Sequence, residues 1–400
     1  MDAGDGRPAA QGAGRVSALP GRDAALTPPP GRVEIGGPAV AGIAGSFLLM
    51  GVVVSMYGPL LLLLTQRFAV GLPVAGSVIS VHFAGGLAGV LIAMRTLTRR
   101  PGRDTFAAGL AVGAAGCAVA AFAPTWPVFL AGIAVIGVGF GSLIIGLNQL
   151  VAYSAGRRRT ALLNGLNGAY SGGAVVGPVL VAAFATGHFS WLFAVSGVLA
   201  LLLVPSTFAV SGRLPVDAGA RRAPGLLVWI FIVAFVFYVG IEVGAAGWMA
   251  SHLESIGLST TGAAAATSGF FLALVSGRLL STLIPATVPE WGIVLGGSAI
   301  ASVALIAASF PPIAVAAYVV TGLALAPIFP TGIVWLARLR PGDSRATSWL
   351  FPAASIGGVL GPGLIGVVIA EFGVRWAPVV LAAVAVLMTA AFAGARREAA

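Results

Sequence analysis

Long apolar runs recur along nearly the whole of this 400-residue chain, and only short polar segments separate them. A helix of about 20 residues crosses the roughly 30 Å hydrocarbon core of a bilayer, because each residue adds about 1.5 Å. Hydrophobic residues make up 58% of the chain and charged residues only 8%, too few for a soluble surface. The pattern therefore predicts an all-α protein that crosses a membrane many times.

Counting the apolar runs from Pro38 onward predicts twelve transmembrane helices. The predicted spans are 39–64, 74–95, 105–123, 127–152, 162–185, 190–210, 225–249, 260–285, 291–310, 313–337, 345–370 and 376–394. Such a succession leaves no room for a separate water-soluble domain.

The arginines test this count, because cytoplasmic loops are enriched in basic residues. All 22 basic residues are Arg, and with the amino terminus inside the cell only Arg67 and Arg375 fall on the outer side. The cytoplasmic set includes the run Arg157–Arg159 and also Arg278. We therefore expect a multi-pass protein of the cell membrane with both termini in the cytoplasm. The net charge of +10 comes from these arginines, whose positions are explained by membrane orientation. We therefore expect no nucleic-acid partner.

Two composition breaks divide the chain. Residues 1–37 are rich in Gly, Ala, Pro and Arg, which predicts a disordered cytoplasmic tail. Residues 211–224 interrupt the apolar pattern and predict a cytoplasmic linker, with one six-helix half at 38–210 and another at 225–400.

An internal repeat supports two halves. The motif Gly172-Gly-Ala-Val-Val-Gly-Pro178 returns as Gly357-Gly-Val-Leu-Gly-Pro362, and the same shift carries Arg95 to within a residue of Arg278. Units with an even number of spans share one orientation, which is a parallel repeat with the substrate site between the halves near the midplane.

Several functional classes lack the residues they need. The chain has no Lys, so it has no P-loop lysine for ATP hydrolysis. One Cys and three scattered His offer no metal cluster, and no nucleophile, base and orienting group occur together. We expect neither an enzyme nor a cofactor nor a bound metal.

One acid and one histidine fall within the predicted spans. Glu242 lies in the apolar run 229–248, and His82 lies in the second span. A carboxylate in hydrocarbon is costly unless it faces a wet cavity, a partner or an exchangeable proton. We therefore predict that Glu242 and His82 couple transport to protons, with a neutral Glu or His that bonds a neighbouring helix as the structural alternative.

Polar and aromatic residues in the spans suggest a binding surface. Amides donate and accept hydrogen bonds, which suits a hydroxyl-rich solute, and aromatic faces suit sugar rings. The candidates are Asn148, Gln149, Tyr57, Tyr238, Trp248, Phe329 and Trp335. Interhelical hydrogen bonding and ordinary packing are the alternatives for each of them.

Four further residues are candidates for gating. Asn164 and Asn167 begin the fifth span near the cytoplasmic face. Pro327 and Pro330 lie three residues apart in the tenth span, and each removes a backbone donor, so together they predict a hinge. A kink with only a packing role is equally compatible with the prolines.

Three segments carry a resemblance to a known family. They are Gly137–Asn148 with Gly172–Pro178, then Tyr238–Gly244 with Trp248, and then Gly322–Thr331. On these segments the chain resembles the major facilitator superfamily, and within it the fucose permease and glucose/galactose transporter group. The resemblance implies a proton-linked sugar carrier that works by alternating access. Two acidic residues matter in that group, one in the first span and one in the fourth, and the corresponding positions of this chain, near Gly58 and Ile144, are not acidic.

The sequence therefore predicts a monomeric secondary transporter for a small polar organic solute, most simply a sugar, driven by protons. The alternative is an efflux carrier for amphipathic compounds, which the weak polarity of the first half would suit.

Overall fold

The computed structural model describes residues 34–97, 99–152, 159–184, 189–212, 224–285, 287–340, 346–347 and 349–399. The predicted tail therefore falls outside the described residues up to position 33, and the predicted linker does so from 213 to 223. Arg157 and Arg158 also lie outside them. The described part is almost entirely helical and contains twelve helical spans, so the predicted fold class is confirmed.

The first half consists of six spans. Its helices are α1 (Gly37–Phe68), α2 (Leu72–Thr96), α3 (Gly102–Ala121), α4 (Trp126–Ala152), α5 (Arg159–Phe184) and α6 (Ser190–Leu203), the last extended by the 3-10 helix η2 (Val204–Ala209). Two short strands, β1 (Glu34–Ile35) and β2 (Val210–Ser211), pair antiparallel and tie the beginning of this half to its end.

The second half has the same plan. Its helices are α7 (Leu226–Ser255), α8 (Thr260–Leu280), α9 (Glu290–Ala307), α10 (Ala314–Leu325), α11 (Ile328–Leu339), α13 (Leu350–Phe372) and α14 (Ala377–Glu398), with 3-10 turns η3 (Ser281–Leu283), η4 (Pro311–Ile313) and η5 (Val374–Trp376). Helices α10 and α11 share the tenth span, 311–339, which is interrupted at Ala326 and Pro327.

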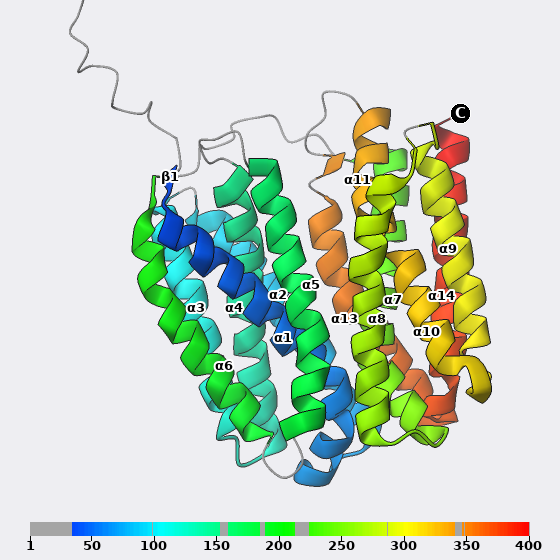
Figure 1. The fold of residues 1–400 in the computed structure, drawn as a ribbon, viewed down its shortest axis with the longest axis horizontal. Coiled ribbons are helices and arrows are strands. Elements are labelled where there is room, and N and C mark those ends of the chain that lie inside the picture. Colours follow the sequence, from blue (N-terminus) through cyan, green and yellow to red (C-terminus); the bar gives the residue numbers. More distant parts are fainter. Residues whose placement is uncertain are drawn as a thin grey trace, which may run out of the picture.

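Figure 1 shows the two halves side by side, with β1 and the C-terminus at the same end of the bundle. We call this the terminal end and the opposite one the far end. Equivalent helices make equivalent contacts: α1 packs on α5 as α7 packs on α13, and α3 packs on α6 as α9 packs on α14. The halves meet through α2 with α13 and through α5 with α8, as expected for a parallel repeat.

Glycines set the close approach of helices. A Cβ added at Gly141 of α4 would lie 1.9 Å from the Gly86 carbonyl oxygen of α2, and one at Gly361 of α13 would lie 2.4 Å from Gly240 of α7. Only a residue without a side chain fits such contacts, which membrane helices use because burial from lipid gives little driving force. Large apolar side chains such as Leu202 and Val303 stay exposed around the bundle, where acyl chains would cover them.

Candidate functional site

A cavity lies between the two halves, near the middle of the bundle. We call it the interface cavity; it has about 380 Å³ of empty volume, open space at its mouth included. Helices α1, α2 and α5 line it from the first half, and α7 and α8 line it from the second. Its residues are Val54, Tyr57, Gly58, Ile79, Tyr170, Glu242, Val243, Ala246, Gly247 and Phe271.

Glu242 is the acidic residue of this cavity, and its partner is Arg278. The Arg278 Nη2 lies 3.6 Å from the Glu242 Oε1, and the two side chains are 31% and 20% exposed, respectively. Both charges are thus withdrawn from water but not sealed from it. A partner of opposite charge offsets much of the desolvation penalty of the carboxylate.

Arg278 also joins the two halves. Its Nη1 donates a hydrogen bond of 3.1 Å to the Ser171 Oγ, so an α8 side chain reaches across to α5. From the sequence, Arg278 is expected among the cytoplasmic arginines that set orientation. The structure instead places it inside the last turn of α8, with its side chain directed to Glu242 and Ser171.

Two tyrosines extend this polar group. Tyr170 comes just before Ser171 on α5 and lines the cavity. Tyr238 lies one turn before Glu242 on α7, and its buried hydroxyl has no hydrogen-bond partner among the described residues. The Tyr238 hydroxyl is close enough to Glu242 and Arg278 to interact electrostatically with both. The Glu242 carboxylate therefore lies near two phenol hydroxyl groups and one guanidinium group.

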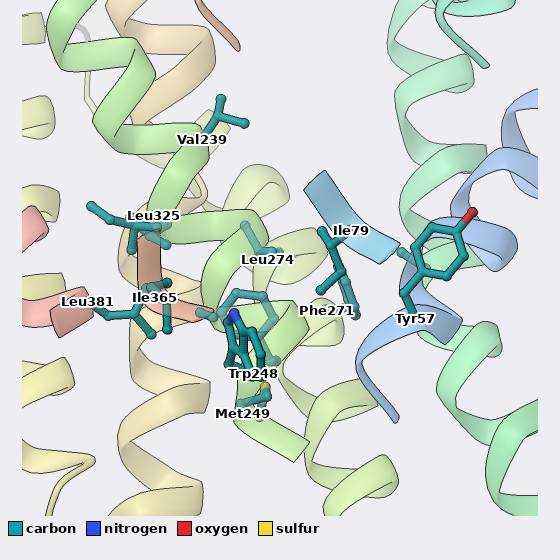
Figure 2. Close-up of a cluster of buried hydrophobic side chains, with 14 of the residues drawn as sticks. Tyr57, Ile79, Val239, Trp248, Met249, Phe271, Leu274, Leu325, Ile365 and Leu381 are labelled. Carbon is teal, nitrogen blue, oxygen red and sulfur yellow. The ribbon is translucent and has the colours of Figure 1, made fainter. Parts of the chain in front are cut away.

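The cavity is closed toward the far end by tight contacts between the halves. A Cβ added at Gly58 of α1 would lie 2.3 Å from the Ala246 carbonyl oxygen of α7. The Trp248 ring fills the space beside Gly76 of α2, and its Nε1 donates to the Pro362 carbonyl at 3.1 Å. Figure 2 shows Trp248 packed with Phe271, Met249 and Ile365, and Ile79 standing between this cluster and Tyr57. Trp248 is thus fully buried at the contact and lies outside the cavity lining.

Tyr57 connects the cavity to His82. The Tyr57 hydroxyl lies 3.0 Å from the Nδ1 of His82, and His82 is fully buried within the first half. Of the two predicted proton-coupling residues, Glu242 lines the interface cavity. His82 does not line this cavity, but it is hydrogen-bonded to Tyr57, which does.

The remaining predicted binding residues lie elsewhere. The Asn148 Nδ2 donates to the Ile144 carbonyl of its own helix at 2.6 Å, and Gln149 is half-buried beside it on α4. Trp335 packs against Phe231 and Phe392, at ring-centroid distances of 4.9 and 6.2 Å. Phe329 packs against Phe235 and Tyr238 at 5.1 and 5.8 Å. Within the described residues, none of these four side chains lines the interface cavity.

The predicted gating residues fall into two groups. Asn164 and Asn167 lie in the first turns of α5, and Asn167 is exposed. Pro327 precedes the first residue of α11, at the break in the tenth span, and Pro330 lies in the first turn of α11. A break is what two closely spaced prolines produce, because each leaves a carbonyl of the preceding turn without its donor.

The family follows from comparison with known proteins. The sequence model of the Major Facilitator Superfamily matches residues 43–289, which is more than half of the chain. The chain belongs to the Major Facilitator Superfamily. It is therefore a multi-pass membrane protein of a family of small-molecule transporters, as the predicted resemblance implied at this level. No curated protein sequence matches it significantly.

Solved structures of this superfamily share the fold at low identity. A bacterial homolog of the human lysosomal transporter Spinster, inward-facing and unoccupied, matches with a TM-score of 0.73 and 15% identity over 90% of this chain and 96% of that one. A D-xylose–proton symporter matches with a TM-score of 0.71 and 14% identity over 89% of this chain and 96% of that one. The nucleoside transporter NupG, as a point mutant, matches with a TM-score of 0.72 and 14% identity over 90% of this chain and 99% of that one. The shared fold extends over nearly the whole chain and does not single out the fucose permease group.

Sequence reasoning missed Arg278, Ser171 and Tyr170. One signal was available, because Arg278 lies inside the predicted span 260–285 and not in a loop. An arginine at that depth needs a counter-charge, and Glu242 was the acid predicted to lie in the membrane. Ser171 and Tyr170 gave no comparable signal, since small hydroxyl residues and tyrosines are common in membrane helices.

Proposed function

We propose that this chain is a secondary transporter that moves a small polar organic solute, a sugar or sugar-like compound, with protons by alternating access. The observation that carries the proposal is the position of Glu242, a half-buried carboxylate in a cavity that both halves line. Such a group binds a solute hydroxyl when ionised and also exchanges a proton with the cavity.

The contacts of Arg278 suggest how protonation is coupled to movement. While Glu242 is ionised, it holds the Arg278 guanidinium, which at the same time donates to Ser171 of the other half. Protonation removes the attraction, and the arginine then loses a fixed position between α7, α8 and α5. The contact of α5 with α8 weakens, so protonation of one residue biases the relative position of the halves.

The lining of the interface cavity suits a solute with several hydroxyls. Tyr57 and Tyr170 bring hydroxyl groups from the first half, and Glu242 brings an acceptor from the second. Phe271 offers an aromatic face of the kind on which sugar rings stack. Because donors and acceptors come from both halves, a bound solute contacts both and is released when they separate.

The test is accumulation in proteoliposomes with an imposed pH gradient. We expect sugars or sugar-like solutes to accumulate in the wild type, and Glu242→Gln to lose accumulation while exchange without a gradient stays measurable. Gln has nearly the same shape as Glu but cannot take up a proton. Loss of accumulation with retained exchange would therefore show that Glu242 is needed for proton coupling and not for solute binding. Unchanged accumulation in Glu242→Gln would rule out its proton-coupling role.

A second candidate function is export of amphipathic compounds in exchange for protons. The observation that favours it is the lining, where the apolar side chains of Val54, Ile79, Val243, Ala246 and Phe271 make up half of the ten lining residues. A hydrophobic cargo would need few polar partners there. The same vesicles discriminate between the two functions. If the chain is an exporter, an imposed proton gradient drives amphipathic dyes across the membrane in the direction opposite to the protons, and added sugars do not inhibit dye transport.

We further propose a cell-membrane location with both termini in the cytoplasm and a monomeric carrier. The segregation of arginines supports the orientation, and the complete cavity within one chain supports the monomer. Protease digestion of sealed vesicles tests the orientation, and crosslinking in the membrane tests the stoichiometry.

A further inference from the structure

The Glu242–Arg278 ion pair constrains the charge of the solute. While Glu242 is ionised, the pair has no net charge, and the Arg278 and Glu242 side chains are only 31% and 20% exposed, respectively. When Glu242 takes up a proton, the Arg278 guanidinium keeps its charge, because arginine stays protonated at any physiological pH. The protonated site therefore has one unbalanced positive charge.

Among the described residues, no neighbouring group supplies the missing negative charge. Besides Glu242, the electrostatic neighbours of Arg278 are Tyr238 and Tyr170, whose hydroxyl groups are neutral at physiological pH. Tyr57 faces the same cavity from α1 and is neutral as well. The other titratable side chains on the helices packed against α7 lie in the last turns of those helices or bond each other, as His252 bonds Tyr318 and His82 bonds Tyr57.

This unbalanced charge sets a requirement for the solute. A half-buried cation that has lost its counter-charge is unfavourable, because too little water replaces the lost partner. Hydroxyl groups of a neutral sugar can accept hydrogen bonds from the guanidinium, but they do not neutralise it. A carboxylate does both, and arginine binds carboxylates through paired hydrogen bonds.

The geometry of Arg278 allows a carboxylate to reach it. Arg278 lies in the last turn of α8, so its side chain approaches Glu242 from the terminal end, away from the tight contacts that close the far end. The distance of 3.6 Å between Arg278 Nη2 and Glu242 Oε1 exceeds the roughly 2.7–2.9 Å of a charge-assisted hydrogen bond. Glu242 therefore holds the guanidinium loosely, and a second carboxylate can make a shorter contact.

Tyr238 offers a partner to Glu242 once it is neutral. Tyr238 lies one turn before Glu242 on α7, and its hydroxyl has no hydrogen-bond partner in the described part of the chain. The same hydroxyl is close enough to Glu242 to interact with it electrostatically. A protonated carboxyl group both donates and accepts, so it can bond this hydroxyl and leave the guanidinium to the solute.

We propose that the solute is a small hydroxycarboxylate, such as a sugar acid, whose carboxylate binds Arg278 after Glu242 has taken up a proton. The assignment rests on the proposed function and narrows its solute class. Hydroxyl groups of the solute face the Tyr170 and Tyr57 hydroxyls of the first half. One proton and one monoanion then move together, so the empty ionised site and the loaded protonated site are both without net charge.

The experiment measures binding to the purified full chain in nanodiscs of neutral lipid, with radiolabelled D-gluconate and D-glycerate as probes. Their neutral partners, D-glucitol and glycerol, carry a hydroxymethyl group in place of the carboxylate. Both acids stay ionised from pH 5 to pH 8, because carboxyl groups titrate near pH 4. For the acid that binds more tightly, we expect wild-type affinity to rise about tenfold or more from pH 8 to pH 5. At pH 5 this acid should compete about tenfold better than its neutral partner.

Three variants separate the roles of the two charges. Glu242→Gln imitates the protonated residue, so we expect it to bind the acid with the same affinity at every pH. Arg278→Gln should bind the acid no better than the neutral partner, whereas Arg278→Lys keeps the charge and should retain part of the preference. Arg375→Gln is the control, because Arg375 is exposed and bonds the Ser255 carbonyl away from the cavity, and it should keep the full preference.

The proposal is overturned if the neutral partners compete as well as the acids in the wild type, or if wild-type binding of the acids does not change with pH. The wild-type pH dependence in Glu242→Gln, or an undiminished preference for the acid in Arg278→Gln, would overturn it as well. Binding is measured without transport. If the acids bind as expected but no solute accumulates with protons, the proposed function alone is wrong; if neutral sugars accumulate and the acids are not preferred, only the solute class is wrong.

Discussion

The two halves of this transporter share one plan but differ in where they carry charge. Each has a buried Tyr–His hydrogen bond, Tyr57 with His82 at 3.0 Å and Tyr318 with His252 at 3.2 Å. In the described residues, however, the ion pair that faces the interface cavity belongs to the second half alone, through Glu242 and Arg278. The first half contributes Tyr57 and Tyr170 to that cavity but no acid or base.

The two halves use the same two kinds of packing. In the first half, α2 and α4 meet through Gly85, Gly86, Gly137 and Gly141, and a separate aromatic cluster is formed by Phe68, Trp126, Phe129, Phe189 and Phe193. In the second half, α7 and α13 meet through Gly240 and Gly361, and an aromatic cluster is formed by Phe231, Phe235, Trp335 and Phe392. The comparison teaches that the halves share their packing and differ in their charged site. A charged site needs only one of the two copies, and the other half can stay neutral.

The largest effect should follow a change in glycine packing. We expect Gly141→Val to abolish the folded protein, because its Cβ would meet the Gly86 carbonyl oxygen at 1.9 Å and backbone cannot yield as a side chain does. The measurement is the yield of monodisperse protein after detergent extraction. Gly296→Val, at an open position, is the control, and an equal yield from both variants would contradict glycine packing in the first half.

The aromatic packing of the second half should be costly to remove but less than fatal. We expect Trp335→Ala to lower the free energy of unfolding by about 3–5 kcal/mol, the usual range for a buried large aromatic. Thermal unfolding in detergent measures the loss, and transport of the remaining folded protein should keep its apparent KM. A raised KM with unchanged stability would contradict a packing role and support the prediction from the sequence that Trp335 binds the solute.

The ion pair sharpens the difference in charge between the halves. We expect Arg278→Gln to reduce gradient-driven accumulation by roughly tenfold, equivalent to about 1.4 kcal/mol, because Glu242 loses its counter-charge and the guanidinium that links it to Ser171 is gone. Accumulation of solute by this variant should also change less than that of the wild type when the imposed pH gradient is varied. Arg375→Gln, which removes a hydrogen bond to the Ser255 carbonyl away from the cavity, should leave the pH dependence as it is in the wild type.

The smallest effect should come from the first-half end of that network. Ser171→Ala removes one hydrogen bond between the halves and leaves the Glu242–Arg278 pair in place, so we expect gradient-driven accumulation to fall by no more than about fivefold. Rates of exchange and of gradient-driven uptake in the same vesicles measure it. Accumulation at the wild-type level in Ser171→Ala would contradict a role for this contact in coupling.

Much of this architecture could be predicted from the sequence, because the membrane imposes it. Twelve apolar runs and the repeated Gly-Gly motif depend on composition and spacing, and Glu242 stood out because acids are rare in such runs. The partner of Glu242 could not be predicted with the same confidence. Whether Arg278 points to lipid headgroups, to a loop or to the cavity depends on how far α8 is rotated, and packing against α5 and α7 decides that rotation.

The amides and aromatics show the same limit. Asn148 has the right chemistry for a hydroxyl-rich solute, but its amide bonds the Ile144 carbonyl of its own helix. Trp248 lies one residue beyond Gly247, which lines the cavity, yet its ring turns into the contact with Gly76. Residue type and depth identify candidates, whereas the direction of a side chain around its helix decides which of them face the cavity.

The central claim is that the charge of the second half couples protons to transport, and the most direct measurement is accumulation in proteoliposomes at a fixed pH gradient, wild type against Glu242→Gln. The account predicts that the variant equilibrates its solute across the membrane but no longer concentrates it. Concentration of solute by Glu242→Gln to the wild-type level would contradict it.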